Sequence, residues 1–123
     1  MKSRYEFEIK ESYLLLNVTG TYDLTDLLSL PAGVKARCEE EGIFKVLMNC
    51  LSLQNTNIST TDRFYLGEKL AQEFKSHIIL AVAWPARDID RFAETVALNR
   101  GGNMYVTGNY AEAEEWLLKS EVQ

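Results

Sequence analysis

The sequence predicts an α/β fold built on a mixed five-stranded sheet, and three observations support this. Apolar and ionic residues alternate over residues 5–10, as in a half-buried strand with one face in water. Later apolar runs begin at Phe44, Ile78 and Met104, and segments with helical periodicity separate them. Helix-linked strands pair in parallel through right-handed crossovers, so the expected order is β-β-α-β-α-β-α-β-α. No linker or repeat divides the chain, and residues 1–123 are expected to form one domain.

The first two strands are expected to form an antiparallel hairpin. A short turn at Glu11-Ser12 separates the alternating segment from a second apolar strand over residues 13–19. Charged side chains on the first strand discourage pairing with other chains, which suits the edge of a sheet. The first strand is therefore placed at the edge, antiparallel to its neighbour.

The segment from Asp23 to Gly42 carries a helical pattern with an interruption. Asp23 with Asp26 three residues later is an N-cap signal. Pro31 and Gly33 interrupt the pattern, because proline lacks the backbone donor that a helix interior needs. The sequence thus predicts a kink, or a short helix followed by a second one starting near Pro31. The apolar stripe comprises Leu24, Leu27, Leu28, Val34 and Cys38.

The middle of the chain predicts a buried strand followed by a long helix. Residues 44–51 are almost wholly apolar, as in central strands of parallel sheets. A polar loop then leads to a helix over residues 59–75. Gly67 inside this helix costs about 1 kcal/mol relative to alanine, which close packing of the helix against the sheet would offset. The apolar stripe comprises Phe64, Gly67, Leu70, Ala71 and Phe74.

The next unit is a buried strand over residues 78–83, ended by Trp84-Pro85, and a helix. Gly101 suits the position just after that helix, where φ is often positive. The helix is expected to bury Ile89, Phe92, Ala93 and Val96.

The chain closes with a short strand over residues 104–107 and a final helix. Asn109 and Glu112 make an N-x-x-E cap for this helix. Its expected core face comprises Ala113, Trp116 and Leu117.

Alternation along the strands sorts their side chains onto two unequal faces. The first face is wholly apolar and comprises Leu14, Leu16, Val18, Val46, Met48, Cys50, Ile78, Leu80, Val82, Met104 and Val106. The second face mixes apolar and polar groups and comprises Tyr13, Leu15, Asn17, Thr19, Leu47, Asn49, Ile79, Ala81, Tyr105 and Thr107. If the strands lie in sequential order, right-handed crossovers put every helix on the first face. The second face is then open to another copy of the chain in a homodimer, to a ligand or to a later element; alternatively, its asparagines merely hydrogen-bond near strand ends.

Composition argues against several classes of function. The net charge is −5, and the 13 basic residues are scattered among 18 acidic ones, so the basic face of a nucleic-acid binder is missing. Cys38 and Cys50 have neither a metal nor a redox spacing and are expected in the core. His77 is the one histidine, and neither a metal nor a cofactor is expected. No apolar run is long enough to cross a bilayer, so the cytoplasm is the expected location.

Three packing and capping motifs give the chain a family resemblance. They are Arg63-Phe64-x-x-Gly67-Glu68-x-Leu70-Ala71, then Phe92-Ala93-Glu94-Thr95-Val96-Ala97-Leu98-Asn99-Arg100-Gly101, then Ala113-x-x-Trp116-Leu117. With this order of elements, the chain resembles the STAS-like superfamily, in particular its SpoIIAA-like subgroup of small uncharacterised bacterial proteins. The resemblance spans nearly the whole chain and implies a (β-α) superhelix with a mixed sheet. Motifs of this kind specify a fold better than an activity.

The resemblance directs attention to the start of the helix over residues 59–75. In the anti-sigma-factor antagonists of this superfamily, a partner kinase phosphorylates a serine at a helix N-terminus. Ser59 is the nearest positional match, followed by Thr60 and Thr61, although the Asp-Ser-Ser-Gly pattern is absent. Ser59 and Asp62 also make an S-x-x-D capping box, which is the commoner use of such a serine. The other interpretation is a phosphate held by the first-turn amides and the positive end of the helix.

Two classes of binding protein follow from these observations. The first, implied by the resemblance, is a non-catalytic regulatory module that binds a protein partner such as a kinase or a regulatory factor. The second is a small apolar ligand or lipid-binding module, related by resemblance to CRAL-TRIO-like domains, whose aromatic residues line a pocket instead of filling the core. The candidate partner or ligand surface comprises Arg63, Phe64, Trp84 and Tyr105.

An enzyme is the least favoured class. Acid–base and nucleophilic catalysis need paired groups with a positioned base. The sequence contains neither G-x-S-x-G nor a phosphate-cradling glycine loop, and Gly101-Gly102 ends a helix instead of starting one. Exposure to solvent is expected for each of four arginines that would otherwise suggest an anion site, namely Arg63, Arg87, Arg91 and Arg100.

Overall fold

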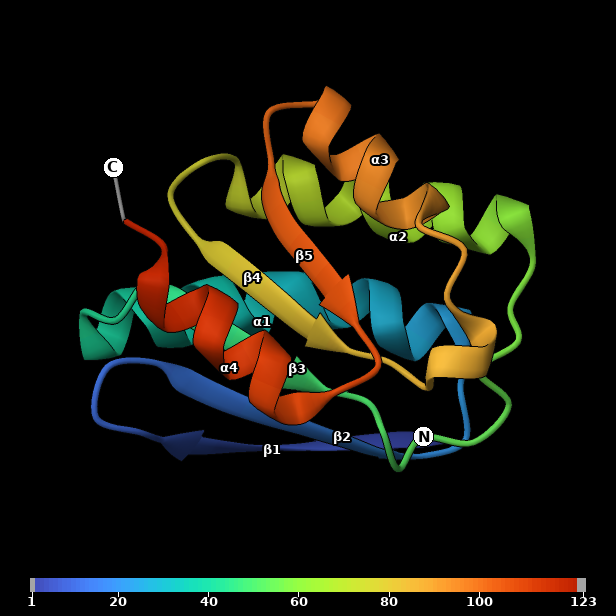
Figure 1. Ribbon diagram of the computed structural model, residues 1–123, viewed down its shortest axis with the longest axis horizontal. Helices are drawn as coiled ribbons and strands as arrows, with labels where there is room; N and C mark the ends of the chain where they lie inside the picture. Colours follow the sequence, from blue (N-terminus) through green and yellow to red (C-terminus); the bar gives the residue numbers. More distant parts are fainter. Residues whose placement is uncertain (1, 122–123) are drawn as a thin grey trace.

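The computed structural model describes residues 2–121 and contains one five-stranded sheet (Figure 1). The strands lie in sequential order and are β1 Ser3–Ile9, β2 Leu14–Gly20, β3 Lys45–Asn49, β4 Ile79–Ala83 and β5 Asn103–Thr107. Strand β1 is antiparallel to β2, and the other three pairings are parallel. The predicted mixed sheet, with its antiparallel strand at one edge, is therefore confirmed.

Residues 2–121 also form four α-helices and one short 3-10 helix. They are α1 Leu24–Glu41, α2 Thr60–Phe74, η1 Ala86–Asp88, α3 Phe92–Asn99 and α4 Tyr110–Lys119. Helices α1, α2 and α3 pack over the first face, where the main core lies. Figure 1 shows α4 on the opposite side of the sheet from α1.

The position of α4 corrects the prediction that every helix lies on the first face. The crossover rule holds for α1, α2 and α3, because each connects two parallel strands. Helix α4 follows the last strand and connects to none, so the rule does not apply to it. Its residues Ala113 and Leu117 are fully buried against Leu47, Ile79 and other second-face residues.

The part of the second face beside α4 is polar. Arg4, Glu6 and Glu8 of β1 are exposed on this side. The predicted asparagine contact is present, since Asn49 Nδ2 donates to Asn17 Oδ1 at 3.1 Å. A homodimer through this face stays a prediction. The part of the face that α4 leaves open would present charged side chains to a second copy instead of an apolar surface.

Helix α1 is continuous through Pro31, so the predicted division into two helices is wrong. Pro31 lies inside the helix and is buried beside Leu30 and Val34. Apolar contacts with the sheet on this side offset the one backbone hydrogen bond that proline cannot make. The predicted N-cap is confirmed, because the Asp23 side chain accepts from the Asp26 amide.

Gly67 does permit a close approach, but to α3 and not to the sheet as predicted. A Cβ placed on Gly67 would lie 2.4 Å from the Ala93 carbonyl oxygen and 3.0 Å from Val96 Cβ. Alanine or any larger residue would push the two helices apart.

The segment before α3 also differs from expectation. Ile89 precedes the helix instead of lying within it, and Phe92 is 37% exposed instead of buried. The two capping predictions for α3 and α4 are confirmed. Gly101 follows α3 with φ +85°, and the Asn109 side chain accepts from the Glu112 amide at the start of α4.

Candidate functional site

The candidate site lies at the carboxyl ends of β3 and β4, where open α/β sheets bind ligands. Ser59 is the N-cap of α2, and its Oγ accepts from the Asp62 amide at 3.1 Å. Thr60 and Thr61 are exposed in the first turn. The Asp62 carboxylate accepts from the Tyr22 hydroxyl at 2.9 Å. The serine half of the predicted capping box is therefore present, while the aspartate side chain ties the helix to Tyr22.

Arg63 is buried, contrary to the expectation of solvent exposure. Only 9% of its side chain is exposed. Its Nε donates to the Ile58 carbonyl at 3.2 Å, and Nη2 donates to the Asp88 carbonyl at 2.8 Å. Its charge is balanced by Asp90, whose Oδ2 lies 3.1 Å from Nε. One guanidinium thus connects the loop before α2 to the loop before α3.

A second set of buried polar contacts joins the same two loops. Thr56 is 1% exposed, and its hydroxyl donates to Asp88 Oδ2 at 2.7 Å. The Trp84 indole nitrogen donates to the Thr56 carbonyl at 3.2 Å. Because these partners are buried, each broken bond would leave an unsatisfied polar group. The contacts hold the two loops in a fixed arrangement.

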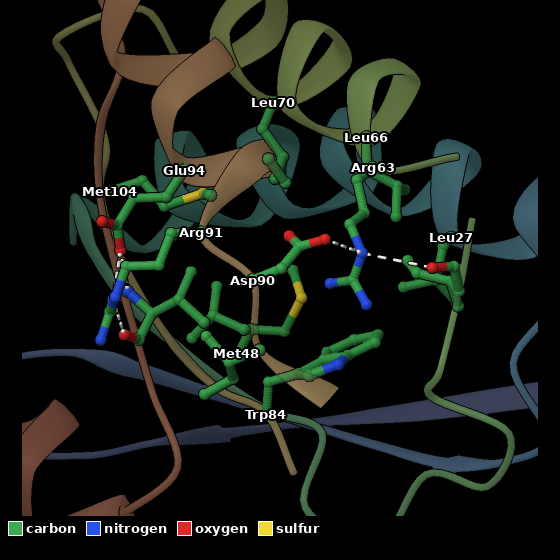
Figure 2. Close-up of a pocket in the computed structure, with 15 residues that line it drawn as sticks. Leu27, Met48, Arg63, Leu66, Leu70, Trp84, Asp90, Arg91, Glu94 and Met104 are labelled. Atoms are coloured by element: carbon green, nitrogen blue, oxygen red, sulfur yellow. Dashed lines mark hydrogen bonds and ion pairs between the residues drawn. The ribbon is translucent and has the colours of Figure 1, made fainter. Parts of the chain in front are cut away.

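A small apolar cavity of about 70 Å³ lies between these loops, α2, α3 and the first face of the sheet (Figure 2). Arg63, Asp90, Arg91 and Glu94 are its charged residues. The apolar lining comprises Leu27, Met48, Ile58, Leu66, Leu70, Val82, Trp84, Ile89, Ala93, Met104 and Val106. Figure 2 shows the Arg63 guanidinium directed inward from α2, toward Trp84.

On the far side of the cavity, Arg91 and Glu94 occupy the free edge of β5. Glu94 Oε2 accepts from the Val106 amide at 2.6 Å, and Arg91 Nη1 donates to the Val106 carbonyl at 2.6 Å. The two side chains also pair with each other at 3.1 Å. They make the contacts that a neighbouring strand would make, which protects the edge from pairing with another chain. Arg91 has φ +65°, an uncommon conformation for a residue with a side chain.

No known family profile matches the sequence, and no curated protein matches it. The structure, in contrast, matches solved structures along most of its length. An anti-sigma factor antagonist from Mycobacterium paratuberculosis matches with a TM-score of 0.56 and 11% identity over 95% of each chain. The protein TM1081 matches with a TM-score of 0.61 and 15% identity, over 95% of this chain and 90% of the other.

A third match carries the fold name. It is an uncharacterized protein of the DUF3478 family with a SpoIIAA-like fold, from Shewanella loihica PV-4. Its TM-score is 0.50 at 21% identity, over 94% of this chain and 93% of the other. The chain has a SpoIIAA-like fold. This confirms the resemblance that the sequence motifs suggested, and at these identities it establishes the fold alone.

The SpoIIAA-like fold does not bring the four predicted surface residues together. Arg63 and Trp84 are buried and line the cavity. Phe64 lies on the outer side of α2, with the Arg100 guanidinium 5.2 Å from its ring centre. Tyr105 is on the second face, where it stacks on Trp116 at 5.2 Å. The four residues therefore belong to three separate places.

The SpoIIAA-like fold also separates Ser59 from the one histidine. His77 precedes β4, at the amino end of the parallel strands, whereas Ser59 follows β3 at the carboxyl end. The two residues lie at opposite ends of the sheet, so His77 is not a base for Ser59. Among residues 2–121, no group of three His, Cys, Asp or Glu side chains is arranged to hold a metal ion. No helix in that range has the length and apolar character needed to span a bilayer.

Sequence reasoning missed Asp88, Asp90 and Glu94. Asp88 and Asp90 lie in the segment between β4 and α3, where no periodicity indicates which side chains point inward, and Glu94 lies in the first turn of the short α3. A weak signal was present for Arg63. It precedes Gly67 by four residues and Leu70 by seven, so it falls on the apolar stripe of α2.

Proposed function

We propose that this protein is a non-catalytic regulatory module of STAS type that binds a protein partner through the start of α2. The observation that carries the proposal is a partly exposed aromatic pair one turn after the exposed hydroxyl cluster. Tyr65 is 46% exposed and packs edge-to-face against Phe64 at 5.7 Å. Tyrosine and phenylalanine are enriched in interfaces, where they supply much of the binding energy.

Several features support a partner at this position. Ser59, Thr60 and Thr61 form an uncharged rim beside the aromatic pair. Arg100 covers Phe64 and pairs with Glu68 at 3.5 Å, so polar groups border the other side. An apolar centre with a polar rim is the usual composition of a protein interface. An anti-sigma factor antagonist shares the fold, which fits a partner such as a kinase or regulatory factor.

Site-specific crosslinking tests this proposal. A photo-reactive residue at Tyr65 is expected to capture one defined protein in the cells that produce this chain. The matched control places the same residue at Lys35, which is exposed on α1 at a different part of the surface. Capture of the same proteins at both positions, or of none at Tyr65, would contradict the proposal. Purified candidate and chain must then bind each other, and the Tyr65→Ala variant must bind more weakly.

The phosphorylation switch is the finer part of the proposal. A phosphate on Ser59 or Thr60 would meet the free amides and positive end of α2, while the Asp62 carboxylate next to it opposes the added charge. Mass spectrometry of the chain from its own cells, before and after incubation with candidate kinases, tests the switch. An unmodified segment over residues 59–61 would remove the switch and leave partner binding untouched.

The second candidate function is an apolar ligand or lipid carrier, and the cavity is the observation that favours it. The lining is mostly apolar, but the volume is about 70 Å³. Sites for drug-sized ligands measure roughly 300–1,000 Å³, so a lipid chain does not fit this conformation. Native mass spectrometry of freshly purified protein would reveal a retained lipid, and its absence would count against the carrier.

A further inference from the structure

Arg63 has more hydrogen-bond donors than the protein uses. A guanidinium carries five N–H groups. In the described range, the Nε hydrogen goes to the Ile58 carbonyl and one Nη2 hydrogen to the Asp88 carbonyl. Asp90 balances the charge from beside Nε, whose single hydrogen is already donated to Ile58. Both hydrogens of Nη1 and one of Nη2 therefore have no protein acceptor among residues 2–121.

The unused donors do not lie in sealed protein. No fully buried side-chain nitrogen or oxygen within residues 2–121 lacks a hydrogen bond, so Nη1 must contact open space. Arg63 lines the cavity, and Figure 2 shows its guanidinium directed toward that space. A positive fork on a side chain that is 9% exposed is a strong site for an anion.

We propose that this cavity binds a short-chain aliphatic carboxylate, with its head group on Arg63 and its tail against the apolar wall. A carboxylate matches the planar fork of a guanidinium in a bidentate pair. Met48, Leu70 and Val82 also line the cavity and offer only apolar surface. The volume of about 70 Å³ limits the tail to a few carbon atoms.

The chemistry of the wall argues against a phosphate. A dianion needs several donors around it, and the other charged residues of the cavity include the two acids Asp90 and Glu94. Arg91 is already engaged, since it donates to Glu94 and to the Val106 carbonyl. One available guanidinium beside an apolar wall suits a monoanion with a tail.

Asp90 lies beside Nε of Arg63, whereas the proposed ligand takes the unused donors of Nη1 and Nη2, so Asp90 competes with it by charge and not by position. Its side chain is 48% exposed and lies at the start of the segment leading into α3. Its Oδ1 accepts from the Phe92 amide at 3.0 Å, so the carboxylate stays beside Nε, where its negative charge weakens the attraction of Arg63 for a second carboxylate. The inference does not depend on the partner surface of α2, so either can fail alone.

Calorimetric titration of the full chain with sodium butanoate tests the inference. Butanoate is expected to bind at one site, while 1-butanol and inorganic phosphate, which supply the tail or the charge alone, bind at least about tenfold more weakly. Equal binding of butanol or phosphate would overturn the proposed head-and-tail recognition. No binding of butanoate would overturn the site.

Three variants connect the binding to the named residues. Asp90→Asn removes the competing carboxylate and is expected to tighten butanoate binding by up to about fivefold. The matched control, Glu68→Gln, removes an equal charge from the outer side of α2 and should leave the affinity unchanged. Arg63→Lys keeps the charge and loses the fork, so binding should weaken by about tenfold or more.

Arg63 also connects two loops, so its replacement disturbs more than the binding site. Leu66→Phe tests the site without changing Arg63. Leu66 lines the cavity and is only partly buried, so a larger ring is tolerated there and fills the space. Butanoate binding should be lost in this variant, with the circular dichroism spectrum unchanged. Unchanged binding in Leu66→Phe, or equal effects of Asp90→Asn and Glu68→Gln, would overturn the assignment.

Discussion

Gly67 lies where α2 and α3 touch, and the absence of a side chain is what permits the contact. Gly67→Ala is expected to lower the free energy of unfolding by about 1–3 kcal/mol, because the new Cβ meets the Ala93 carbonyl oxygen at 2.4 Å. Gly33→Ala is the matched control. The nearest atom to its new Cβ is the Tyr5 hydroxyl at 3.7 Å, so a gain of about 0.4–1 kcal/mol is expected.

Urea unfolding of the two glycine variants measures both effects. Opposite signs are expected for the same chemical change in two helices. A stabilised Gly67→Ala variant would mean that α3 does not approach α2 as closely as described.

Ser59 permits a similar separation of stability from function. Ser59→Ala removes the acceptor for the Asp62 amide and should cost about 1 kcal/mol. Ser59→Asp keeps a good N-cap acceptor and should leave the stability nearly unchanged. Thermal unfolding of the two variants checks this order. If Ser59→Asp loses as much stability as Ser59→Ala, the side chain is not acting as a cap.

Arg63 marks the limit of sequence reasoning at the residue scale. Its spacing from Gly67 and Leu70 placed it on the buried stripe, but a charge there is expected to avoid the core. What overcomes the cost of burial is a set of acceptors from two loops, the carbonyls of Ile58 and Asp88 and the carboxylate of Asp90. Loops have no periodicity, so the sequence does not reveal that these acceptors meet.

At the scale of elements, the pairing of α3 with the edge of β5 is testable. Glu94→Ala removes the acceptor of the Val106 amide, and exchange of that amide with deuterium should accelerate roughly tenfold or more, since a charged hydrogen bond contributes about 1.5–3 kcal/mol. Glu68→Ala, which removes a surface partner of Arg100, should leave that amide unchanged. Hydrogen exchange measured by NMR distinguishes the two. An unaffected Val106 amide in Glu94→Ala would show that Glu94 does not protect the strand edge.

The elements that the sequence predicts well are those whose signal is local. Strand β1 follows from alternation, and the starts of α1, α2 and α4 follow from the cap residues Asp23, Ser59 and Asn109. Pro31 predicts an interruption of α1, but the helix continues because burial of Pro31 in the core outweighs the missing backbone hydrogen bond. The short α3 begins at Phe92, and its N-cap residue Arg91 has a left-handed conformation and makes no side-chain cap, so no capping pattern marks the start.

At the scale of the whole molecule, the order of strands follows from chain connectivity. Each helix that joins parallel strands must cross on the same side, which fixes the main core. Helix α4 has no such constraint, and only the apolar centre of the second face determines where it packs. A polar contact also holds α4 against the sheet, since the Tyr13 hydroxyl donates to Glu114 Oε2 at 2.5 Å. Chain connectivity therefore predicts the helix layer on the first face. The position of α4 on the second face depends instead on the apolar surface that the other helices leave uncovered.

Burial of weak acids across both layers predicts a fold that alkaline pH destabilises. Burial raises the pKa of Cys38 to about 11 and that of Cys50 to about 12. Burial and hydrogen bonds to carboxylates also raise the pKa of Tyr13 and of Tyr22. Each group holds its proton more tightly in the folded state. The stabilisation is therefore complete below the unfolded pKa values and declines as the pH rises through them toward the folded values.

The free energy of unfolding should accordingly be level near neutral pH and fall from about pH 8.5, the pKa of cysteine in the unfolded chain. Urea unfolding between pH 7 and about pH 10.5 measures the slope. Replacing both cysteines with alanine removes their contribution to the pH dependence. The free energy of unfolding should then vary less around pH 9–10, leaving the later decline that the tyrosines cause. Stability that stays level to about pH 10.5 in the parent chain would mean that the cysteines ionise as easily when folded. Buried thiols could not do so, and the burial of Cys38 on α1 and of Cys50 just after β3 would then need revision.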